Sequence, residues 1–271
     1  MKDSENVDPR NKLNALSGKE WIRFTKSWFI ADGKPSDISR EIDLHPASFP
    51  PSMIEDFINF FTKPGEKVLD PFLGTGSTLV ACENTGRKGV GIELYPRYAE
   101  TAKSRTKFPV LEGDLRNLLC TLENKTFSLC ITSPPYWRIL KKNKDYNQQE
   151  RLKKGLDLQY GQNPLDLGMI EDKEEFLKEL VGIFTQIHEL LTKGAHLVVF
   201  IQNVRDKGEM IPLAFELPLR LKNWYSFLGE RVWLQNQKIL RPYGYPYSFV
   251  SNIHHHFALI FKKRPQENQK E

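Results

Sequence analysis

Short apolar runs alternate with longer stretches in which apolar residues recur at helical spacing. The apolar runs predict strands near 67–70, 89–93, 109–113, 127–132, 196–202, 230–236 and 254–262. The stretches between them predict helices at 77–85, 96–106, 172–191 and 212–223. Because strand and helix alternate, we expect a mostly parallel, doubly wound α/β sheet with right-handed crossovers in a single domain.

Three segments fall outside this alternation. Residues 1–15 are polar and predicted to be disordered. The aromatic stretch Trp21 to Phe29 is predicted to form a short helix that packs on the core. Residues 138–170 form a long, polar, basic connection, and loops of that length are commonly functional or disordered.

Composition fits a protein of this class. A chain of 271 residues is long enough to bury a full core in one α/β domain. Cys82, Cys120 and Cys130 lack the spacing of metal ligands and are interpreted as reduced structural residues. No apolar run is long enough to span a bilayer, and the N-terminus does not resemble a signal peptide, so we expect a cytoplasmic protein without membrane contact.

Acidic residues follow three successive predicted strands. Asp70, Glu93 and Asp114 each stand at the carboxyl end of a strand, and Gly74 and Gly76 follow the first of them. Glycines in such a turn let the backbone approach a ligand closely, and the next helix offers free N–H groups. Glu93 lies nineteen residues after Gly74, close to the offset at which a carboxylate meets ribose hydroxyls. The pattern predicts a nucleoside pocket at the carboxyl edge of the sheet.

A second unusual segment, Thr132-Ser-Pro-Pro-Tyr-Trp137, follows the apolar run at 127–131. Two consecutive prolines fix their φ angles and lack N–H donors, so the segment continues neither a helix nor a sheet ladder. It is predicted to form a stiff corner that presents carbonyls, a hydroxyl and two aromatic rings. This combination favours binding of a flat, amine-bearing ring.

The charge of the chain is concentrated beyond this corner. The net charge of +5 is modest, but seven basic residues and two acids lie between Arg138 and Lys154. Lysine and arginine side chains neutralise phosphates and supply most nonspecific affinity for DNA. Two further stretches are less specific. His254 to His256 alternate between the faces of a predicted strand and are interpreted as strand residues near the site, and Arg241 to Tyr247 is either a stacking loop or an ordinary turn.

Taken in order, Asp70-Pro-Phe-Leu-Gly-Thr-Gly-Ser-Thr, Glu93, Asp114 and Ser133-Pro-Pro-Tyr-Trp resemble the amino-methylating DNA methyltransferases. His45 to Pro50 resembles the segment that precedes the Asp-Pro-Phe motif in that family. The resemblance covers roughly residues 45–262, with the cofactor motif first, whereas many members have the Ser-Pro-Pro-Tyr motif first. It implies a Rossmann-like sheet of seven strands and S-adenosylmethionine as cofactor. It also implies an N-terminal extension over 1–44 that packs on the core and a catalytic domain over 45–265.

The resemblance assigns roles to individual residues. Glu93 is expected at the ribose hydroxyls, with Asp114 at the adenine amine and Leu115 at an adenine face. The residues expected around the methionine part of the cofactor are Asp70, Phe72, Gly74 and Gly76. The residues expected to act on the target base are Ser133, Pro134, Pro135 and Tyr136. The residues expected to contact nucleic acid are Trp137, Arg138, Lys141, Lys142, Lys144 and Arg151. No metal ligand is expected.

The expected reaction is methylation of a base amine in double-stranded DNA. In the family, serine at position 133 usually accompanies N4-cytosine methylation, and aspartate accompanies N6-adenine methylation. A carbon-5 cytosine enzyme would need a cysteine after a proline, which Cys120 and Cys130 do not provide. N6-adenine methylation, methylation of an RNA amine, and a non-catalytic nucleoside-binding or DNA-binding subunit remain alternatives. A dehydrogenase does not explain the proline corner.

The expected partners are duplex DNA and a cognate restriction endonuclease, for a monomer or a homodimer. The family's separate target-recognition region is small or missing here. Only residues 138–170, and secondarily 203–211 and 236–252, are available for that purpose.

Overall fold

The computed structural model describes residues 7–31, 49–137 and 163–265. Its main sheet has eight strands in the order β1-β9-β10-β6-β5-β2-β3-β4. Their bounds are β1 Trp28–Ile30, β2 Lys67–Asp70, β3 Lys88–Glu93, β4 Val110–Glu112, β5 Phe127–Thr132, β6 Leu191–Ile201, β9 Tyr225–Leu234 and β10 His255–Lys263. Only β10 runs antiparallel to its neighbours, β6 and β9. The predicted Rossmann-like, mostly parallel sheet is therefore confirmed, with β1 as an eighth strand at the edge.

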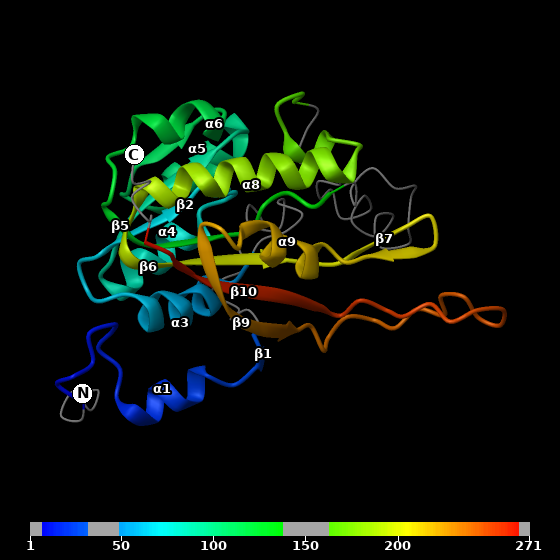
Figure 1. Cartoon of the computed structure of the whole chain (residues 1–271), viewed down its shortest axis with the longest axis horizontal. Helices are drawn as coiled ribbons and strands as arrows, with labels where there is room; N and C mark the ends of the chain where they lie inside the picture. The colour runs from blue at the N-terminus through cyan, green and yellow to red at the C-terminus, as the bar shows by residue number, and fades with distance from the viewer. Residues whose placement is uncertain (1–6, 32–48, 138–162, 266–271) are drawn as a thin grey trace.

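Helices cover both faces of the sheet (Figure 1). The longer helices are α3 Pro51–Phe61, α4 Ser77–Thr85, α5 Pro96–Arg105, α8 Lys173–Leu190 and α9 Leu213–Leu221, and the shorter ones are α1 Gly18–Phe24 and α6 Leu115–Leu118. Apolar residues of α1, α3 and α4 form a core with one face of β2, β5 and β6. Those of α6, α8 and α9 form a second core on the opposite face.

Local chemistry explains where the main helices begin. The Asp172 side chain caps α8 by accepting a hydrogen bond from Glu175 N at 2.8 Å. Two glutamates occupy the first turn of α8, where their negative charge interacts favourably with the positive end of the helix dipole. Proline at the first helical position suits α3 and α5, because that position needs no N–H donor. Helices α4, α5, α8 and α9 lie within a few residues of their predicted positions.

Two predictions for the N-terminal region are wrong. Residues 7–15 are ordered rather than disordered, since the buried Asn14 amide donates to Phe60 O of α3 at 2.6 Å. The stretch Trp21 to Phe29 is not one helix: α1 ends at Phe24, and Trp28–Ile30 then forms β1. Strand β1 pairs in parallel with Val232–Leu234 of β9, about two hundred residues later in the chain.

Besides β1, four α-helices and strands of the described residues were not predicted: α3, α6, β7 Val204–Asp206 and β8 Glu209–Ile211, the last two of which pair as an antiparallel hairpin. Helix α3 supplies much of one core through Phe57, Ile58 and Phe61. Among the described residues, no helix has the length and apolar character needed to cross a membrane.

Candidate functional site

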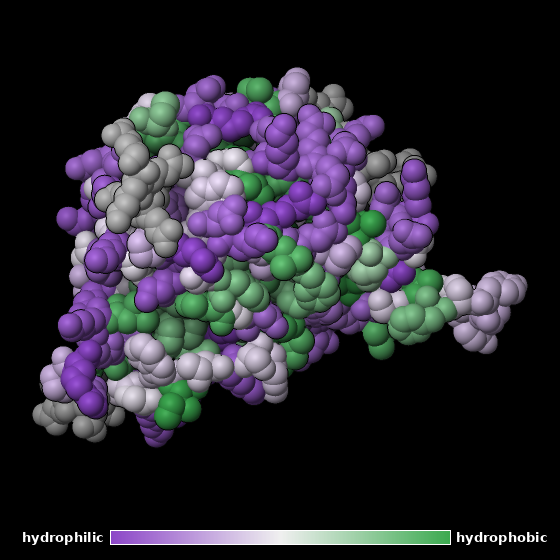
Figure 2. Space-filling view, viewed as in Figure 1, coloured by the Kyte–Doolittle hydropathy of each residue, from purple (hydrophilic) through white to green (hydrophobic). Residues whose placement is uncertain are grey.

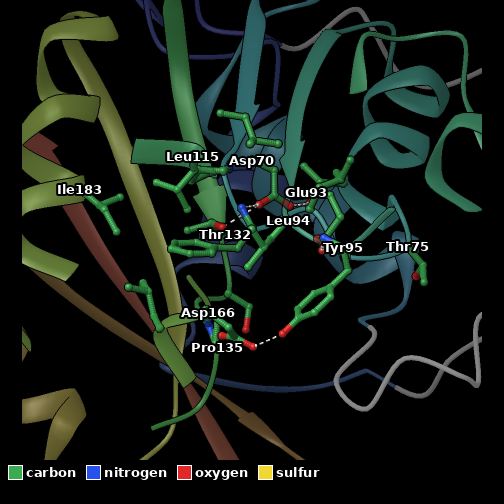
Figure 3. A pocket seen from close by; sticks show the side chains of 18 of the residues that line it. Asp70, Thr75, Glu93, Leu94, Tyr95, Leu115, Thr132, Pro135, Asp166 and Ile183 are labelled. Carbon is green, nitrogen blue, oxygen red and sulfur yellow. Dashed lines mark hydrogen bonds between the residues drawn. The ribbon is translucent and has the colours of Figure 1, made fainter. Parts of the chain in front are cut away.

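A pocket opens at the carboxyl ends of β2, β3 and β5 (Figure 3). It encloses about 980 Å³ of space free of protein atoms, part of which is continuous with solvent. Its wall comes from the β2–α4 turn, the ends of β3 and β5, the start of α6 and residues 165–167. Ligands of open parallel sheets bind at this edge, where the loops between strands and helices meet.

Asp70 organises the β2–α4 turn from within the wall. Its Oδ1 accepts hydrogen bonds from Phe72 N at 3.1 Å and from Thr132 Oγ1 at 2.6 Å, and its Oδ2 accepts one from Thr78 Oγ1 at 2.6 Å. Burial raises the pKa of this carboxyl, and the three donors oppose that rise. One carboxylate thus connects β2, α4 and β5.

The two glycines of this turn have different surroundings. Gly74 lines the pocket with φ +57°, and its N–H donates to Glu93 Oε2 at 2.8 Å. Gly76 adopts φ +90° and does not line the pocket. A Cβ at Gly76 would lie 3.0 Å from the Cβ of Ala102 on α5, so glycine is needed there for close packing of the turn against α5.

Glu93 stands at the centre of the acidic wall. Its second carboxylate oxygen, Oε1, accepts from Tyr95 N at 2.9 Å, so a backbone amide reaches each oxygen. Burial raises the pKa of Glu93 to about 7, the charges of Asp70 and Asp166 add to the rise, and the two amides oppose it. The carboxyl therefore changes charge close to neutral pH.

Asp114 and Leu115 form the wall at the start of α6. The Asp114 carboxylate accepts from Arg116 N at 3.0 Å and Arg116 Nε at 2.9 Å, which caps the short helix. Arg116 also donates to Leu165 O at 2.9 Å and so connects this wall to the segment at 163–170. The buried Leu115 side chain supplies an apolar surface.

Asp166 is a pocket residue that the sequence analysis missed. It is buried, its Oδ1 accepts from Gly168 N at 2.8 Å, and its Oδ2 accepts from Tyr95 Oη at 2.7 Å. Figure 3 shows the Tyr95 phenol directed at this carboxylate. The sequence Asn163-Pro-Leu-Asp-Leu-Gly168 carried a signal, because Asn and Asp side chains commonly bond to nearby backbone amides in turns.

The corner after β5 reaches the same pocket. Ser133 and Pro135 line it, whereas Pro134 and Tyr136 do not. The Tyr136 hydroxyl lies 3.3 Å from His256 Nδ1 on β10, and burial raises the pKa of Tyr136 while hydrogen bonding to Ser133 lowers it. Burial, with the charge of Lys238 nearby, lowers the pKa of His256 to about 3, so this imidazole is neutral.

Trp137 requires a correction. Assigned to nucleic acid from the sequence, it is only 4% exposed and packs in the core that contains α8. Its ring is therefore a core residue rather than a surface for a base. The basic residues Arg138, Lys141, Lys142, Lys144 and Arg151, and most of His45 to Pro50, lie outside the described residues.

The pocket is strongly acidic. Among the described residues, its wall contains Asp70, Glu93, Asp114 and Asp166, and one basic residue, Arg116. Such a wall favours a ligand with hydroxyl or amine donors and positive charge. Within the described part of the chain, no group of His, Cys, Asp and Glu side chains has the arrangement of a metal site.

Comparisons with known proteins point to one class. Residues 3–104 match the model of a family described as DNA methylase, of the N6 and N4 type. The chain is 43% identical over 75 residues to the type II methyltransferase M.Cfr9I of Citrobacter freundii, which covers 28% of this chain and 23% of that protein. It is 35% identical over 108 residues to the type II methyltransferase M.BglI of Bacillus subtilis, which covers 39% of this chain and 28% of that protein.

A solved methyltransferase from Pyrococcus furiosus aligns with a TM-score of 0.48 at 16% identity, over 82% of this chain and 87% of that one. The sequence matches to M.Cfr9I and M.BglI span about a quarter of the length of each relative. Over residues 3–104, the chain is similar to the family described as DNA methylase.

Proposed function

We propose that this protein transfers a methyl group from S-adenosylmethionine to the N4 amine of a cytosine flipped out of duplex DNA. The observation that carries the proposal is that Glu93 and Ser133, from the two separate motifs, line one pocket. A cofactor site and a base-amine site must adjoin for direct transfer. In this proposal, residues 45–265 form the catalytic domain and residues 1–44 an extension.

The pocket fits the proposed cofactor. Each oxygen of the Glu93 carboxylate accepts one amide hydrogen and has a further lone pair for a ribose hydroxyl. We assign Asp114 and Leu115 to the adenine, and Phe72 with the backbone around Gly74 to the methionine part. The cofactor supplies an activated methyl group on a positively charged sulfur, and the acidic wall is complementary to that charge.

Two assigned residues act indirectly in this scheme. Asp70 keeps the turn in shape through its three hydrogen bonds, and Gly76 permits the approach of α5. Both are positioning residues for the cofactor wall.

Ser133 carries the base-binding part of the proposal. Its hydroxyl oxygen would accept a hydrogen from the target amine, which localises the nitrogen lone pair and directs it toward the methyl group. The Pro134 carbonyl is assigned the second amine hydrogen. Pro135 shapes the wall beside Ser133, and Tyr136 is assigned to the base, although its ring tilts against His256 with centroids 5.8 Å apart.

The matches to type II enzymes support a place in restriction and modification, with a cognate endonuclease acting on the same DNA sequence. We also propose that the protein acts as a monomer or homodimer. Serine rather than aspartate at position 133 supports cytosine as the target.

The test is incubation with isotopically labelled S-adenosylmethionine and genomic DNA or RNA, followed by nucleoside mass spectrometry. Label is expected in N4-methylcytosine from DNA. Ser133→Ala is expected to lower kcat by about 100-fold, because it removes a group aligned only with the reacting amine. The matched control is Ser104→Ala, since Ser104 is exposed on α5 and its hydroxyl donates to Thr101 O of the same helix at 2.7 Å.

Each alternative has its own outcome. Label confined to N6-methyladenine would make the cytosine assignment wrong, and label confined to RNA would change the substrate. Cofactor binding without transfer by the wild type would indicate a non-catalytic subunit.

A further inference from the structure

The connection between β9 and β10, residues 235–254, projects from the body of the molecule as an extended arm (Figure 1). We call it the aromatic arm, because Tyr243, Tyr245, Tyr247 and Phe249 lie within it. Figure 2 shows this projection with few strongly hydrophilic residues. No residue of the arm has a role in the proposed methyl transfer.

Three of its rings are almost fully exposed. Tyr245 is 81% exposed, Tyr247 93% and Phe249 91%. Rings in that position add little to the stability of the fold, because they bury little area. Clustered exposed aromatic residues are typical of a surface that binds something.

The arm is held in shape at its base and at its tip. At the base, Arg241 N donates to Asn252 Oδ1 at 2.9 Å, and Asn252 Nδ2 donates back to Arg241 O at 2.9 Å. Arg205 of β7 donates to Ser251 O at 3.1 Å. At the tip, the amides of Tyr247 and Ser248 both donate to Gly244 O, at 2.7 and 2.8 Å. These hydrogen bonds define how the exposed rings are presented.

The arm leaves the sheet at the edge where the pocket opens. Strand β9 is antiparallel to β10, which is antiparallel to β6, so β9 runs in the same direction as β6 and β5. The carboxyl end of β9, where the arm begins, therefore lies on the same edge as the carboxyl end of β5. Next to the arm, His256 of β10 contacts Tyr136 of the corner.

Charge indicates which partner the arm fits. The segment 231–265 contains no aspartate or glutamate, and the arm carries Lys238 and Arg241. Aromatic rings combined with positive charge match a polyanion that offers flat apolar faces, which is the chemistry of nucleic acid. A second copy of this chain fits less well, because its net charge of +5 opposes a basic arm.

We propose that the aromatic arm is a DNA-binding element that places Tyr245, Tyr247 and Phe249 in a groove of the duplex beside the target base. The rings would pack on sugars or enter a base step, as apolar wedges do in proteins that bend DNA. This inference rests on the proposed function, because flipping a base requires the enzyme to hold the duplex and the arm would provide that contact. It gives the protein a contact with DNA beside the pocket.

The experiment compares the wild type with the triple variant Tyr245→Ser, Tyr247→Ser, Phe249→Ser. Affinity for labelled short duplexes of random sequence is measured by fluorescence anisotropy at several salt concentrations, and cofactor affinity by calorimetry. We expect DNA affinity to fall by about 10-fold or more at every salt concentration, since each stacked ring contributes substantially to binding. Cofactor affinity and the melting temperature are expected to stay unchanged.

The matched control variant is Ile22→Ser with Leu219→Ser, which removes apolar residues that are 72% and 70% exposed on α1 and α9. It should bind DNA as the wild type does. A separate variant, Lys238→Gln with Arg241→Gln, should weaken binding chiefly at low salt and flatten its salt dependence.

The outcomes separate the two proposals. If the wild type methylates DNA and the triple variant binds DNA equally well, the arm proposal is wrong and the proposed function stands. If the wild type transfers no methyl group but binds DNA through the arm, the proposed function is wrong and the arm proposal stands. A wild type that binds no DNA overturns both.

Discussion

The pocket and the aromatic arm lie at one edge of the same sheet but have opposite chemistry. The pocket collects buried acids, and hydrogen bonds reach Asp70, Glu93 and Asp166 from the surrounding protein. The arm contains no acid and exposes three aromatic rings almost completely. The two regions therefore differ in their relation to folding. The buried carboxylates of the pocket are part of the packed fold, whereas the exposed rings of the arm contribute little to its stability.

The contrast has a physical basis. Burying a carboxylate costs free energy unless hydrogen-bond donors reach it, so each acid of the pocket needs donors at fixed positions in the surrounding protein. An exposed ring has no such requirement, and only the backbone of the arm is held in place. We therefore expect substitutions in the pocket to change folding stability and substitutions in the arm to leave it unchanged.

The largest effect is expected at Glu93. Because burial raises its pKa from 4.5 to about 7, the folded state holds the proton more tightly than the unfolded state. Stability from this group is therefore present below pH 4.5 and is lost as the pH rises toward 7, by about 3 kcal/mol in total. Urea unfolding across this range should show that Glu93→Gln lacks this loss.

A parallel pH dependence in the wild type and Glu93→Gln would mean that Glu93 titrates as an exposed carboxyl does, and the contrast with the arm would weaken. The same pKa bears on the cofactor. Hydroxyl donors favour the ionised carboxylate, so cofactor affinity should increase as the pH rises through 7 and then level off.

The next effect is expected at Thr132. Replacing it by valine removes the donor 2.6 Å from Asp70 Oδ1 and leaves a buried carboxylate short of one hydrogen bond. We expect the free energy of unfolding to fall by about 2 kcal/mol, measured by urea titration. Thr101→Val is the control, because Thr101 is only partly buried on α5 and its hydroxyl donates to Arg97 O in an exposed hydrogen bond. Equal stability of both variants would contradict this account of Asp70.

A smaller effect is expected at Tyr95. Phenylalanine at this position loses the hydrogen bond from Tyr95 Oη to Asp166, which connects the end of β3 to the wall at 165–167. The expected loss of stability is about 1 kcal/mol, with a decrease of several-fold in cofactor affinity. Tyr247→Phe on the arm removes a hydroxyl from a ring that is 93% exposed and should change neither quantity.

The smallest effect on folding is expected in the arm itself. The triple serine variant at Tyr245, Tyr247 and Phe249 should unfold within about 0.5 kcal/mol of the wild type, because surface changes away from structural features have effects of that size. Thermal and urea unfolding measure it. A larger loss would mean that these rings pack against the protein in solution, and the distinction between pocket and arm would fail.

Local sequence was sufficient for the centre of the fold. Strands β2, β3 and β5 and helix α8 were predicted because their apolar spacing, and the caps of α8, are local signals. Helix α3 was missed although its start carried a signal, because Pro51 occupies the first helical position, where proline is favoured. Strand β1 was missed because its pairing with Val232–Leu234 is distant in sequence.

The site residues likewise divide into those that local sequence located and those that depend on tertiary packing. The positions of Asp70, Glu93 and Asp114 in the pocket could be predicted, because a carboxylate at the carboxyl end of a strand is located by the strand. Asp166 could not be located so simply, since its contact with Tyr95 depends on how the segment 163–170 folds back across the pocket. Trp137 was misassigned because an aromatic residue after two prolines is compatible with a core or a surface, and only packing distinguishes them.

The pairing of β1 with β9 has a consequence for the order of folding during synthesis. Arg231 on β9 lies 4.1 Å above the Phe24 ring and donates to Lys26 O at 3.0 Å, so several contacts of the N-terminal segment depend on β9. On the ribosome, residues 18–30 emerge early but lack these partners until residues 225–234 have been made. Helix α1 and strand β1 therefore complete their docking only after β9 has been made, which is the slow step expected for contacts of long sequence separation.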